Sequence, residues 1–470
     1  MKLATLFLAL FLAVATPAQS PYPDTPAARQ FSAWLEAFNS GDRARLLAYL
    51  EKNNPSRAPE IDGEMSFREN TGGFDFKKSQ ESTANRFTGI VKEKNSDQYA
   101  SFEIEVESTA PYKIVALGLR AIAQPADFPL ARLSEAEAVK LLRAELEKST
   151  SADTFSGTAL IAKNEKPIFA EAYGQSDRAA KTPNKLSTRF RIGSMNKMFT
   201  ATAILQLNQA GKLQLTDTIG KILPDYPNKN VATKVTIHHL LTHTGGTGDI
   251  FGPDFESHRL QLKTLNDYVA LYGKRDLQFE PGSKWDYSNY GFLLLGVIIE
   301  KISGQSYYDY VQQNIFKPAG MTSTASLPED QSVPERSTGY TKRGPGTTWA
   351  SNVDTLPYRG SSAGGGYSTV EDLLRFASAL TSLKLLDGSH FELLTTGKAD
   401  TPMGEKYAYG FQDQHINGVR CFGHGGGAPG MNGELTICPQ SGYTIAVLAN
   451  LDPPAASRVA TFIASRLPAK

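Results

Sequence analysis

The stretch FRIGSMNKMFTATAILQLNQAG, residues 190–211, decides the fold because it places a serine and a lysine at the start of an apolar helix. Ser194 and Lys197 are one helical turn apart, and the predicted helix over 194–210 ends at Gly211. A helix that is apolar on nearly every side belongs in a protein interior, so we expect Lys197 to be buried. Burial and the positive end of the helix dipole both lower a lysine pKa. Because positions i and i+3 share a face, the pattern predicts a serine nucleophile beside a neutral amine.

The Ser-x-x-Lys pattern also has a simpler explanation. A chain of this length contains about two such strings by chance. Ser194 would then be a helix N-cap, and Lys197 would extend into solvent. This motif alone leaves both interpretations open.

Length and composition indicate a soluble globular protein. The chain has 470 residues, of which 40% are hydrophobic and 21% charged, and two domains are expected for this length. Its formal net charge is +1, and no basic stripe is visible, which argues against a nucleic-acid partner.

The N-terminus has the pattern of a secretory signal peptide over residues 1–18. Lys2 precedes an apolar run over 3–15, and Thr16-Pro17-Ala18 offers small residues for cleavage. The run is too short to span a bilayer, and no later segment is long and apolar enough. We therefore expect a periplasmic or secreted protein without a stable membrane span, the alternative being an uncleaved N-terminal anchor.

Two cysteines, Cys421 and Cys438, are present in the chain. If they lie on a hairpin that turns near Pro429-Gly430, a register that pairs His424 with Leu435 also sets the two cysteines opposite each other. Export would permit a disulfide there. Two buried thiols are the alternative.

Residues 20–128 are expected to form a small N-terminal α+β domain. Apolar residues at helical spacing follow Thr25-Pro26, Asn39-Ser40-Gly41-Asp42 breaks that helix, and a second helix is predicted over 43–52. Alternating residues around 102–107 predict a half-buried strand. Two helices on a curved antiparallel sheet loosely resemble the nuclear transport factor 2-like domains. A substrate-shaping or dimerising role and the oligomeric state both stay open.

Residues 131–470 are expected to form the second domain. Strands early and late in this segment, with helices between them, predict an α+β fold in which both ends close one antiparallel sheet beside a helical region. The predicted helices are 134–148, 194–210, 290–303 and 454–466, and the predicted strands are 155–163, 167–174, 432–438 and 442–450.

Two further motifs follow the serine in order. Tyr287-Ser288-Asn289 precedes a buried helix, and His424-Gly425-Gly426-Gly427 lies at the end of a predicted strand. The order Ser-x-x-Lys, Tyr-x-Asn, His-x-Gly resembles the serine β-lactamase and penicillin-binding-protein superfamily, most closely its class C-like branch of esterases, D-aminopeptidases and DD-peptidases. The resemblance covers about residues 150–470 and includes three flanking segments, 190–193, 239–246 and 364–369.

The resemblance implies a role for each motif residue. Ser194 would attack a carbonyl to form an acyl-enzyme, with Lys197 and Tyr287 as general base and proton relay. Asn289 would bind substrate and hold Lys197, and His424 would steer substrate and assist Tyr287. Taken singly, the tyrosine would be ordinary packing, Asn289 a helix cap and His424 a surface residue.

The glycine strand would complete the site. The backbone N–H groups of Ser194 and Gly427 would form the oxyanion hole, and Gly425 and Gly426 would let the strand edge approach the substrate. The mechanism implied needs no metal and no cofactor. The expected partner is a small ester, D-amino-acid peptide or β-lactam-like substrate.

The third motif bears on substrate choice. Family members that bind a substrate carboxylate usually carry Lys-Thr-Gly or His-Thr-Gly, whereas this chain has Gly425 in place of the hydroxyl residue. His424, neutral at pH 7 if unperturbed, replaces a fixed charge. Esterase or D-amino-acid peptidase activity is therefore favoured over β-lactamase or DD-carboxypeptidase activity. A non-catalytic protein that binds cell-wall or β-lactam fragments is the other alternative.

Three other patterns in the chain match active-site signatures and are rejected. Tyr226-Pro227-Asn228 repeats Tyr-x-Asn, but it lies in a proline-rich turn. His239 and His243 have metal-ligand spacing but no acidic third ligand, so we expect them to satisfy backbone groups at a helix end. Ser362 lies in a Gly-x-Ser-x-Gly string that lacks the strand and the immediate helix of a nucleophile elbow.

Overall fold

The computed structural model describes residues 21–344 and 348–470 and divides the chain into two compact units. The first contains the chain up to Asn95 together with Ala100–Arg120, and the second contains Ser96–Tyr99 with Ala121–Lys470. The unit boundary therefore lies earlier than the predicted domain end at 128. Tyr99 and Phe128 both belong to the second unit, where their rings stack with centroids 5.7 Å apart. The predicted signal peptide lies outside the described residues.

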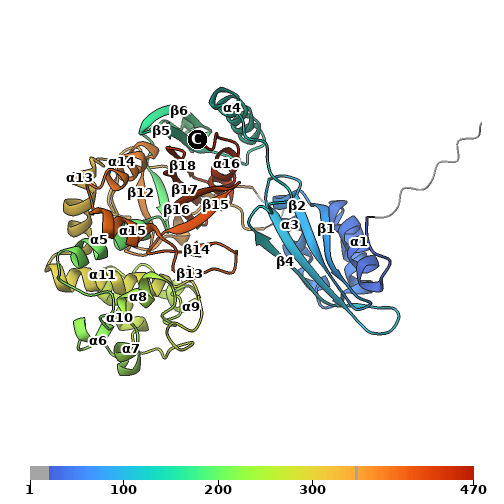
Figure 1. The fold of residues 1–470 in the computed structure, drawn as a ribbon, viewed down its shortest axis with the longest axis horizontal. Helices are drawn as coiled ribbons and strands as arrows, with labels where there is room; N and C mark the ends of the chain where they lie inside the picture. Colours follow the sequence, from blue (N-terminus) through green and yellow to red (C-terminus); the bar gives the residue numbers. More distant parts are fainter. Residues whose placement is uncertain (1–20, 345–347) are drawn as a thin grey trace, which may run out of the picture. The chain divides into compact units, whose positions relative to one another are not determined.

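The N-terminal unit is built from helices and a four-stranded sheet of order β1-β2-β3-β4 (Figure 1). The Phe31 ring stacks on Phe102 at 3.7 Å and Trp34 stacks on Phe38 at 5.0 Å, which confirms the predicted amphipathic helix. The structure also contains a third helix, α3, which the sequence pattern does not predict. Few of its residues are buried, so its sequence shows little apolar periodicity. The elements are α1 (Pro26–Asn39), α2 (Arg43–Asn53), the short 3-10 helix Ala58–Glu60, α3 (Ile61–Thr71), β1 (Phe74–Ser82), β2 (Arg86–Glu93), β3 (Tyr99–Val106) and β4 (Ile114–Ile122).

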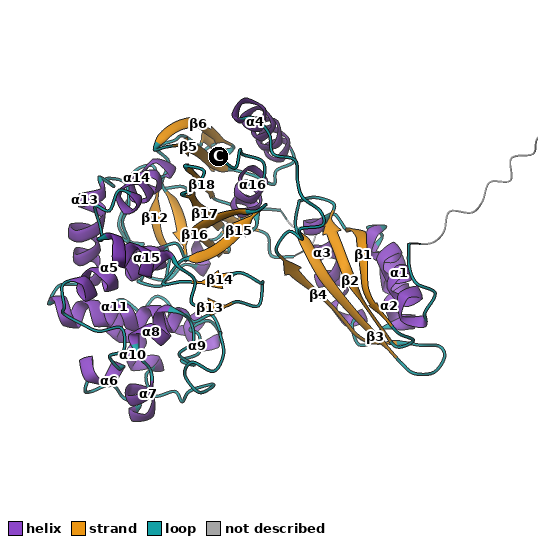
Figure 2. Ribbon diagram, in the orientation of Figure 1, coloured by secondary structure: helices purple, strands orange, loops and turns teal. Residues whose placement is uncertain are grey.

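The larger unit is organised around an eight-stranded antiparallel sheet of order β13-β14-β15-β16-β17-β18-β5-β6. The first strand of the unit pairs with the last, so both ends of this segment close the sheet, as predicted. Figure 2 shows these strands between helices on either side. The sheet strands are β5 (Gly157–Lys163), β6 (Lys166–Tyr173), β13 (Ala399–Asp400), β14 (Lys406–Tyr407), β15 (Gln412–Ile416), β16 (Val419–Ala428), β17 (Met431–Cys438) and β18 (Tyr443–Ala449).

Small strands and helices outside the main sheet complete this unit. The remaining strands are β7 (Gln175–Asp177), β8 (Thr182–Pro183), β9 (Phe190–Gly193), β10 (Tyr340–Thr341), β11 (Ala350–Ser351) and β12 (Gly366–Ser368). The helices are α4 (Glu135–Ser151), α5 (Asn196–Gln209), α6 (Ile219–Ile222), α7 (Lys229–Lys234), α8 (Ile237–Leu241), α9 (Pro253–His258), α10 (Leu265–Tyr272), α11 (Asn289–Ser303), α12 (Tyr307–Val311), α13 (Lys317–Ala319), α14 (Val370–Thr381), α15 (Gly388–Thr395) and α16 (Ala455–Ala464), with a π-turn at Gln312–Phe316 and a short 3-10 helix at Val353–Thr355. No helix within 21–344 or 348–470 is long and apolar enough to cross a membrane.

Two hydrophobic cores lie on the two faces of the sheet. Helices α4 and α16 cover one face. The apolar residues of α5 and α11 belong to the larger core on the other face, as their all-round apolar sequences predict. Because α5 is enclosed on every side, any polar group in its first turn must find its partners inside the protein.

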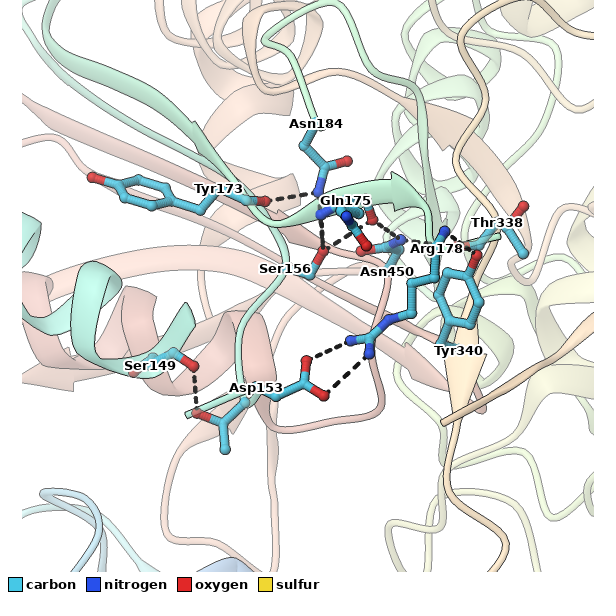
Figure 3. A network of polar contacts seen from close by, with 11 residues as sticks. Ser149, Asp153, Ser156, Tyr173, Gln175, Arg178, Asn184, Thr338, Tyr340 and Asn450 are labelled. Carbon is cyan, nitrogen blue, oxygen red and sulfur yellow. Dashed lines mark hydrogen bonds and ion pairs between the residues drawn. The ribbon is translucent and has the colours of Figure 1, made fainter. Parts of the chain in front are cut away.

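Asparagine side chains form hydrogen bonds near the ends of neighbouring strands of the sheet, as Figure 3 shows. Asn184 donates from Nδ2 to Ser156 Oγ at 3.0 Å and to the Tyr173 carbonyl at 2.8 Å. Asn450 donates to the Gln175 carbonyl at 3.0 Å. These bonds satisfy backbone carbonyl groups at positions where the hydrogen bonds between strands end.

The hairpin of β16 and β17 has the predicted register. His424 pairs with Leu435, and the structure joins Cys421 to Cys438 by a disulfide. The alternative of two separate thiols is thus not the state observed. The bridge lies on the face covered by α4 and α16, away from α5.

Replacing both cysteines by serine should lower the free energy of unfolding by about 3 kcal/mol, because the bridge restricts the unfolded chain. Denaturant titration measures the change. Reductant should destabilise the wild-type protein and leave the double variant unaffected. Equal stability of the two oxidised proteins would contradict this prediction.

Candidate active site

The candidate nucleophile lies between a short strand and a buried helix. β9 leads directly into Ser194, and α5 begins two residues later with Met195 at its N-cap, where no side chain makes a capping bond. The Ser194 hydroxyl is therefore not used as a helix cap. Lys197 has 0% of its surface exposed, so the alternative of a lysine extending into solvent is wrong.

The Lys197 amine is held by three oxygen atoms. Its Nζ lies 2.7 Å from Asn289 Oδ1 and 2.6 Å from the Ala363 carbonyl oxygen, and 3.1 Å from Ser194 Oγ. The amide and carbonyl oxygens accept the two N–H groups of a neutral amine. Its lone pair then remains for the third neighbour, the serine hydroxyl. These contacts orient the amine as a proton acceptor.

The charge state of the lysine follows from its surroundings. Burial lowers the Lys197 pKa from its ordinary value to about 7, and the negative charge of Asp249 opposes that shift. Near neutral pH a substantial fraction of the amine is therefore uncharged and able to take a proton.

The pKa of Tyr287 is shifted in the opposite direction from that of Lys197. Its ring centroid lies 4.8 Å from Lys197 Nζ, and its hydroxyl shares a hydrogen bond with Ser194. Burial raises the Tyr287 pKa well above its ordinary value, although the bond to Ser194 lowers it in part. Tyr287 therefore keeps its proton at neutral pH and can donate it, while Lys197 is the stronger candidate base.

Asn289 is positioned by a residue that the sequence motifs did not reveal. It is the first residue of α11, and Ser288, not Asn289, is the N-cap. Asp249 accepts from the Asn289 backbone N–H at 2.9 Å and from its Nδ2 at 3.2 Å. This leaves Asn289 Oδ1 to face Lys197. The glycine-rich sequence over 245–248 indicates a loop just before Asp249. No spacing in the sequence connects this aspartate with Asn289.

His424 is buried, so the interpretation as a surface residue is wrong. Its Nδ1 lies against the Gly425 carbonyl and must carry the proton, which leaves Nε2 to accept from the Tyr407 hydroxyl at 2.9 Å. Burial and the nearby Lys197 charge lower the His424 pKa to about 3. His424 is thus a neutral ring braced by Tyr407. The sequence predicts that His424 assists Tyr287. The two ring centroids are 6.5 Å apart, and the hydrogen bonds of the His424 ring go to Tyr407 and Gly425.

The two histidines with metal-ligand spacing accept hydrogen bonds from backbone N–H groups. His239 Nδ1 accepts from the Thr236 N–H at 3.3 Å, and His243 Nδ1 accepts from the Ser288 N–H at 3.1 Å. The His243 ring also packs 4.2 Å from that of Tyr287. Among the residues that the structure describes, no group of three His, Cys, Asp or Glu side chains is arranged for a metal ion.

The glycine strand approaches the nucleophile very closely. A Cβ on Gly426 would lie 1.9 Å from the Ile192 carbonyl oxygen and 3.1 Å from the Ser194 nitrogen. A Cβ on Gly193 would lie 2.9 Å from the Gly427 nitrogen. No side chain fits at either position, so the backbones of residues 193–194 and 426–427 lie close together, with the two candidate oxyanion-hole nitrogens in these segments.

Two rejected patterns have structural roles elsewhere. Tyr226 is buried, and its hydroxyl bonds to that of Tyr290, while Asn228 caps α7. Ser362 has 0% exposure, and its segment leads into β12 and not a helix. The neighbouring Ala363 instead supplies the carbonyl that holds Lys197.

Comparison with known proteins shows the family of the chain. The sequence profile of the family described as beta-lactamase matches residues 141–470. The chain belongs to this family. Over 297 residues it is 33% identical to PbpX of Bacillus subtilis (strain 168), an alignment that covers 63% of this chain and 70% of the relative.

Solved structures of other proteins are also similar to this chain. A penicillin-binding protein from Bacillus halodurans is 34% identical, with a TM-score of 0.62, and the match covers 67% of this chain and 97% of that one. A D-stereospecific amidohydrolase from Streptomyces is 28% identical, with a TM-score of 0.58 and coverage of 68% and 96%. The protein is a serine hydrolase of the beta-lactamase family with a smaller N-terminal unit.

Changing Asp249 to Asn should move the acid limb of kcat/KM to lower pH, because the lost negative charge no longer raises the Lys197 pKa. It should also lower kcat about tenfold, since an amide offers Asn289 one acceptor in place of two. A pH–rate profile with a p-nitrophenyl ester measures both. Asp254→Asn, an exposed charge on α9, is the matched control. An acid limb that stays in place would contradict this role for Asp249.

Proposed function

We propose that the protein hydrolyses an ester or amide bond through an acyl-enzyme on Ser194. The observation that carries the proposal is the Lys197 amine, 3.1 Å from Ser194 Oγ, with two acceptors already holding its N–H groups. The lowered Lys197 pKa supports the same role.

Acylation follows from these contacts. Lys197 takes the Ser194 proton as Oγ bonds to the substrate carbonyl carbon, and the oxygen that becomes negative lies between the Ser194 and Gly427 N–H groups. Tyr287 gives its proton to the leaving alcohol or amine as the carbonyl bond to that group breaks. Proton transfer from the lysine ammonium to Tyr287 restores both groups.

Deacylation uses the same residues with water as nucleophile. The neutral amine, through Tyr287, takes a proton from water as its oxygen attacks the acyl carbon. Ser194 Oγ leaves the acyl carbon and receives that proton from the Lys197 ammonium, which regenerates the free enzyme. Water adds across the scissile bond, so no cofactor is needed.

The preferred substrates are esters or D-amino-acid amides and peptides. Gly425 provides no hydroxyl for a substrate carboxylate, and His424 is neutral, which disfavours efficient β-lactamase or DD-carboxypeptidase activity. The similarity to a D-stereospecific amidohydrolase supports the amide class.

Export to the periplasm or the medium is part of the proposal. The signal-peptide pattern over 1–18 supports it, and the disulfide fits an oxidising compartment. The nuclear transport factor 2-like character of the N-terminal unit remains a prediction.

Intact-mass spectrometry with p-nitrophenyl esters should show a transient acyl adduct on the wild-type protein and none on Ser194→Ala. Turnover should follow, and Lys197→Ala should reduce it by at least about a hundredfold, as expected for loss of a general base. Absence of an adduct, or an adduct that persists in Ser194→Ala, would defeat the proposal. A stable adduct without turnover would instead favour a binding protein.

The pH dependence of kcat/KM should report Lys197. The amine must be neutral to accept a proton, so activity is present above its pKa and is lost as pH falls below about 7. Below that point kcat/KM should decrease about tenfold per pH unit. Stopped assays from pH 5 to 9 with a neutral ester check the limb. A profile that is flat down to about pH 5 would rule out this base.

A further inference from the structure

His243 contacts Tyr287 and forms hydrogen bonds with both of its neighbours in the chain. Its Nδ1 accepts from the Ser288 N–H at 3.1 Å, and its carbonyl oxygen accepts from the Asp286 N–H at 2.9 Å. Its ring packs against the Tyr287 ring, with the two centroids 4.2 Å apart. A single residue therefore fixes the backbone on either side of the tyrosine and contacts the tyrosine ring as well.

The backbone of His243 has a conformation that is unfavourable for a residue with a side chain. The residue follows Thr242, the C-cap of α8, and its φ of 59° lies in the left-handed region. Glycine or asparagine usually occupies this position after a helix. A histidine stays in this conformation only where its surroundings hold it, and such conformations are concentrated at functional sites. The contacts with residues 286–288 provide that support.

The His243 ring is neutral and takes no part in proton transfer. The residue is 1% exposed, and burial lowers its pKa well below the ordinary value. Because Nδ1 accepts a hydrogen bond, the hydrogen of the neutral ring lies on Nε2. Within residues 21–344 and 348–470 Nε2 has no hydrogen-bond partner. The ring therefore contributes packing and orientation.

The same ring also contacts the residue that supports the third motif. Its centroid lies 4.6 Å from that of Tyr407, whose hydroxyl donates to His424 Nε2 at 2.9 Å. The help to Tyr287 that the motif resemblance assigns to His424 is thus available from a different histidine, His243.

We propose that His243 is a positioning residue for Tyr287, and that it holds the tyrosine hydroxyl where it can donate to the leaving group. The inference rests on the proposed function and deepens it, because it concerns the range of leaving groups that the site accepts. An alkoxide or an amine anion leaves poorly and needs a proton as its bond to the carbonyl carbon breaks. A p-nitrophenolate leaves without one. His243 therefore extends hydrolysis from activated esters to alkyl esters and amides.

The test compares the p-nitrophenyl and ethyl esters of one acid by kcat/KM, which reports acylation for both. In His243→Asn the amide oxygen replaces Nδ1 as acceptor for the Ser288 N–H, and asparagine tolerates the left-handed conformation, so mainly the ring is lost. The ethyl ester should lose about a hundredfold in kcat/KM and the p-nitrophenyl ester much less, because a displaced donor affects only the leaving group that needs its proton.

Tyr287→Phe should change the ratio of the two kcat/KM values in the same direction. Adding His243→Asn to Tyr287→Phe should change that ratio no further, since both substitutions act on one proton transfer.

His239→Asn is the matched control. His239 lies in α8, and its Nδ1 also accepts a backbone N–H, from Thr236, but its ring packs against that of His238. This variant should leave the ratio of the two kcat/KM values unchanged.

Losses of equal size on both esters in a folded His243→Asn protein would overturn the inference, because they indicate a structural role alone. A wild-type protein that cleaves the p-nitrophenyl ester and not the ethyl ester would overturn it too, even if His243→Asn did not fold. If an activated ester acylates Ser194 while the ratio does not respond to His243→Asn, the inference alone fails. If no ester acylates Ser194, the proposed function fails with it.

Discussion

The burial of one lysine amine is the constraint on which the rest of this structure depends. Lys197 is enclosed in the first turn of α5, and its amine has its partners inside the protein. An uncompensated buried amine is unfavourable, so the fold must supply acceptors from distant segments. The carbonyl of Ala363 and the amide of Asn289 do so. Their positions in turn fix the loop before β12 and the start of α11, and Asp249 holds the amide in place.

The site combines low charge with close backbone packing. Burial biases Lys197 and His424 toward their neutral forms and Tyr287 toward its protonated form. A neutral interior strengthens the remaining hydrogen bonds, including those that the oxyanion nitrogens would make. The glycines of β16 make this environment reachable, because only a strand without side chains can lie against Ser194.

Much of this could be predicted from sequence, because each motif is local. The all-round apolar pattern of α5 predicted a buried Lys197, and the hairpin register followed from one turn position. Asp249 and Tyr407 were missed because their roles depend on partners far away in the chain. Tyr407 lies in a two-residue strand without periodicity. His424 was expected to assist Tyr287, and its contact with Tyr407 comes from strand pairing that no motif encodes.

The sequence by itself determined the family, the order of the serine, tyrosine and histidine motifs, and the sheet closed by both ends of the larger unit, since periodicity and local motifs carry that information. Only the tertiary structure decided which groups face the lysine and how His424 is protonated. The physical reason is that hydrogen bonding and burial are set by distances between segments. Those distances exist only once the chain has folded.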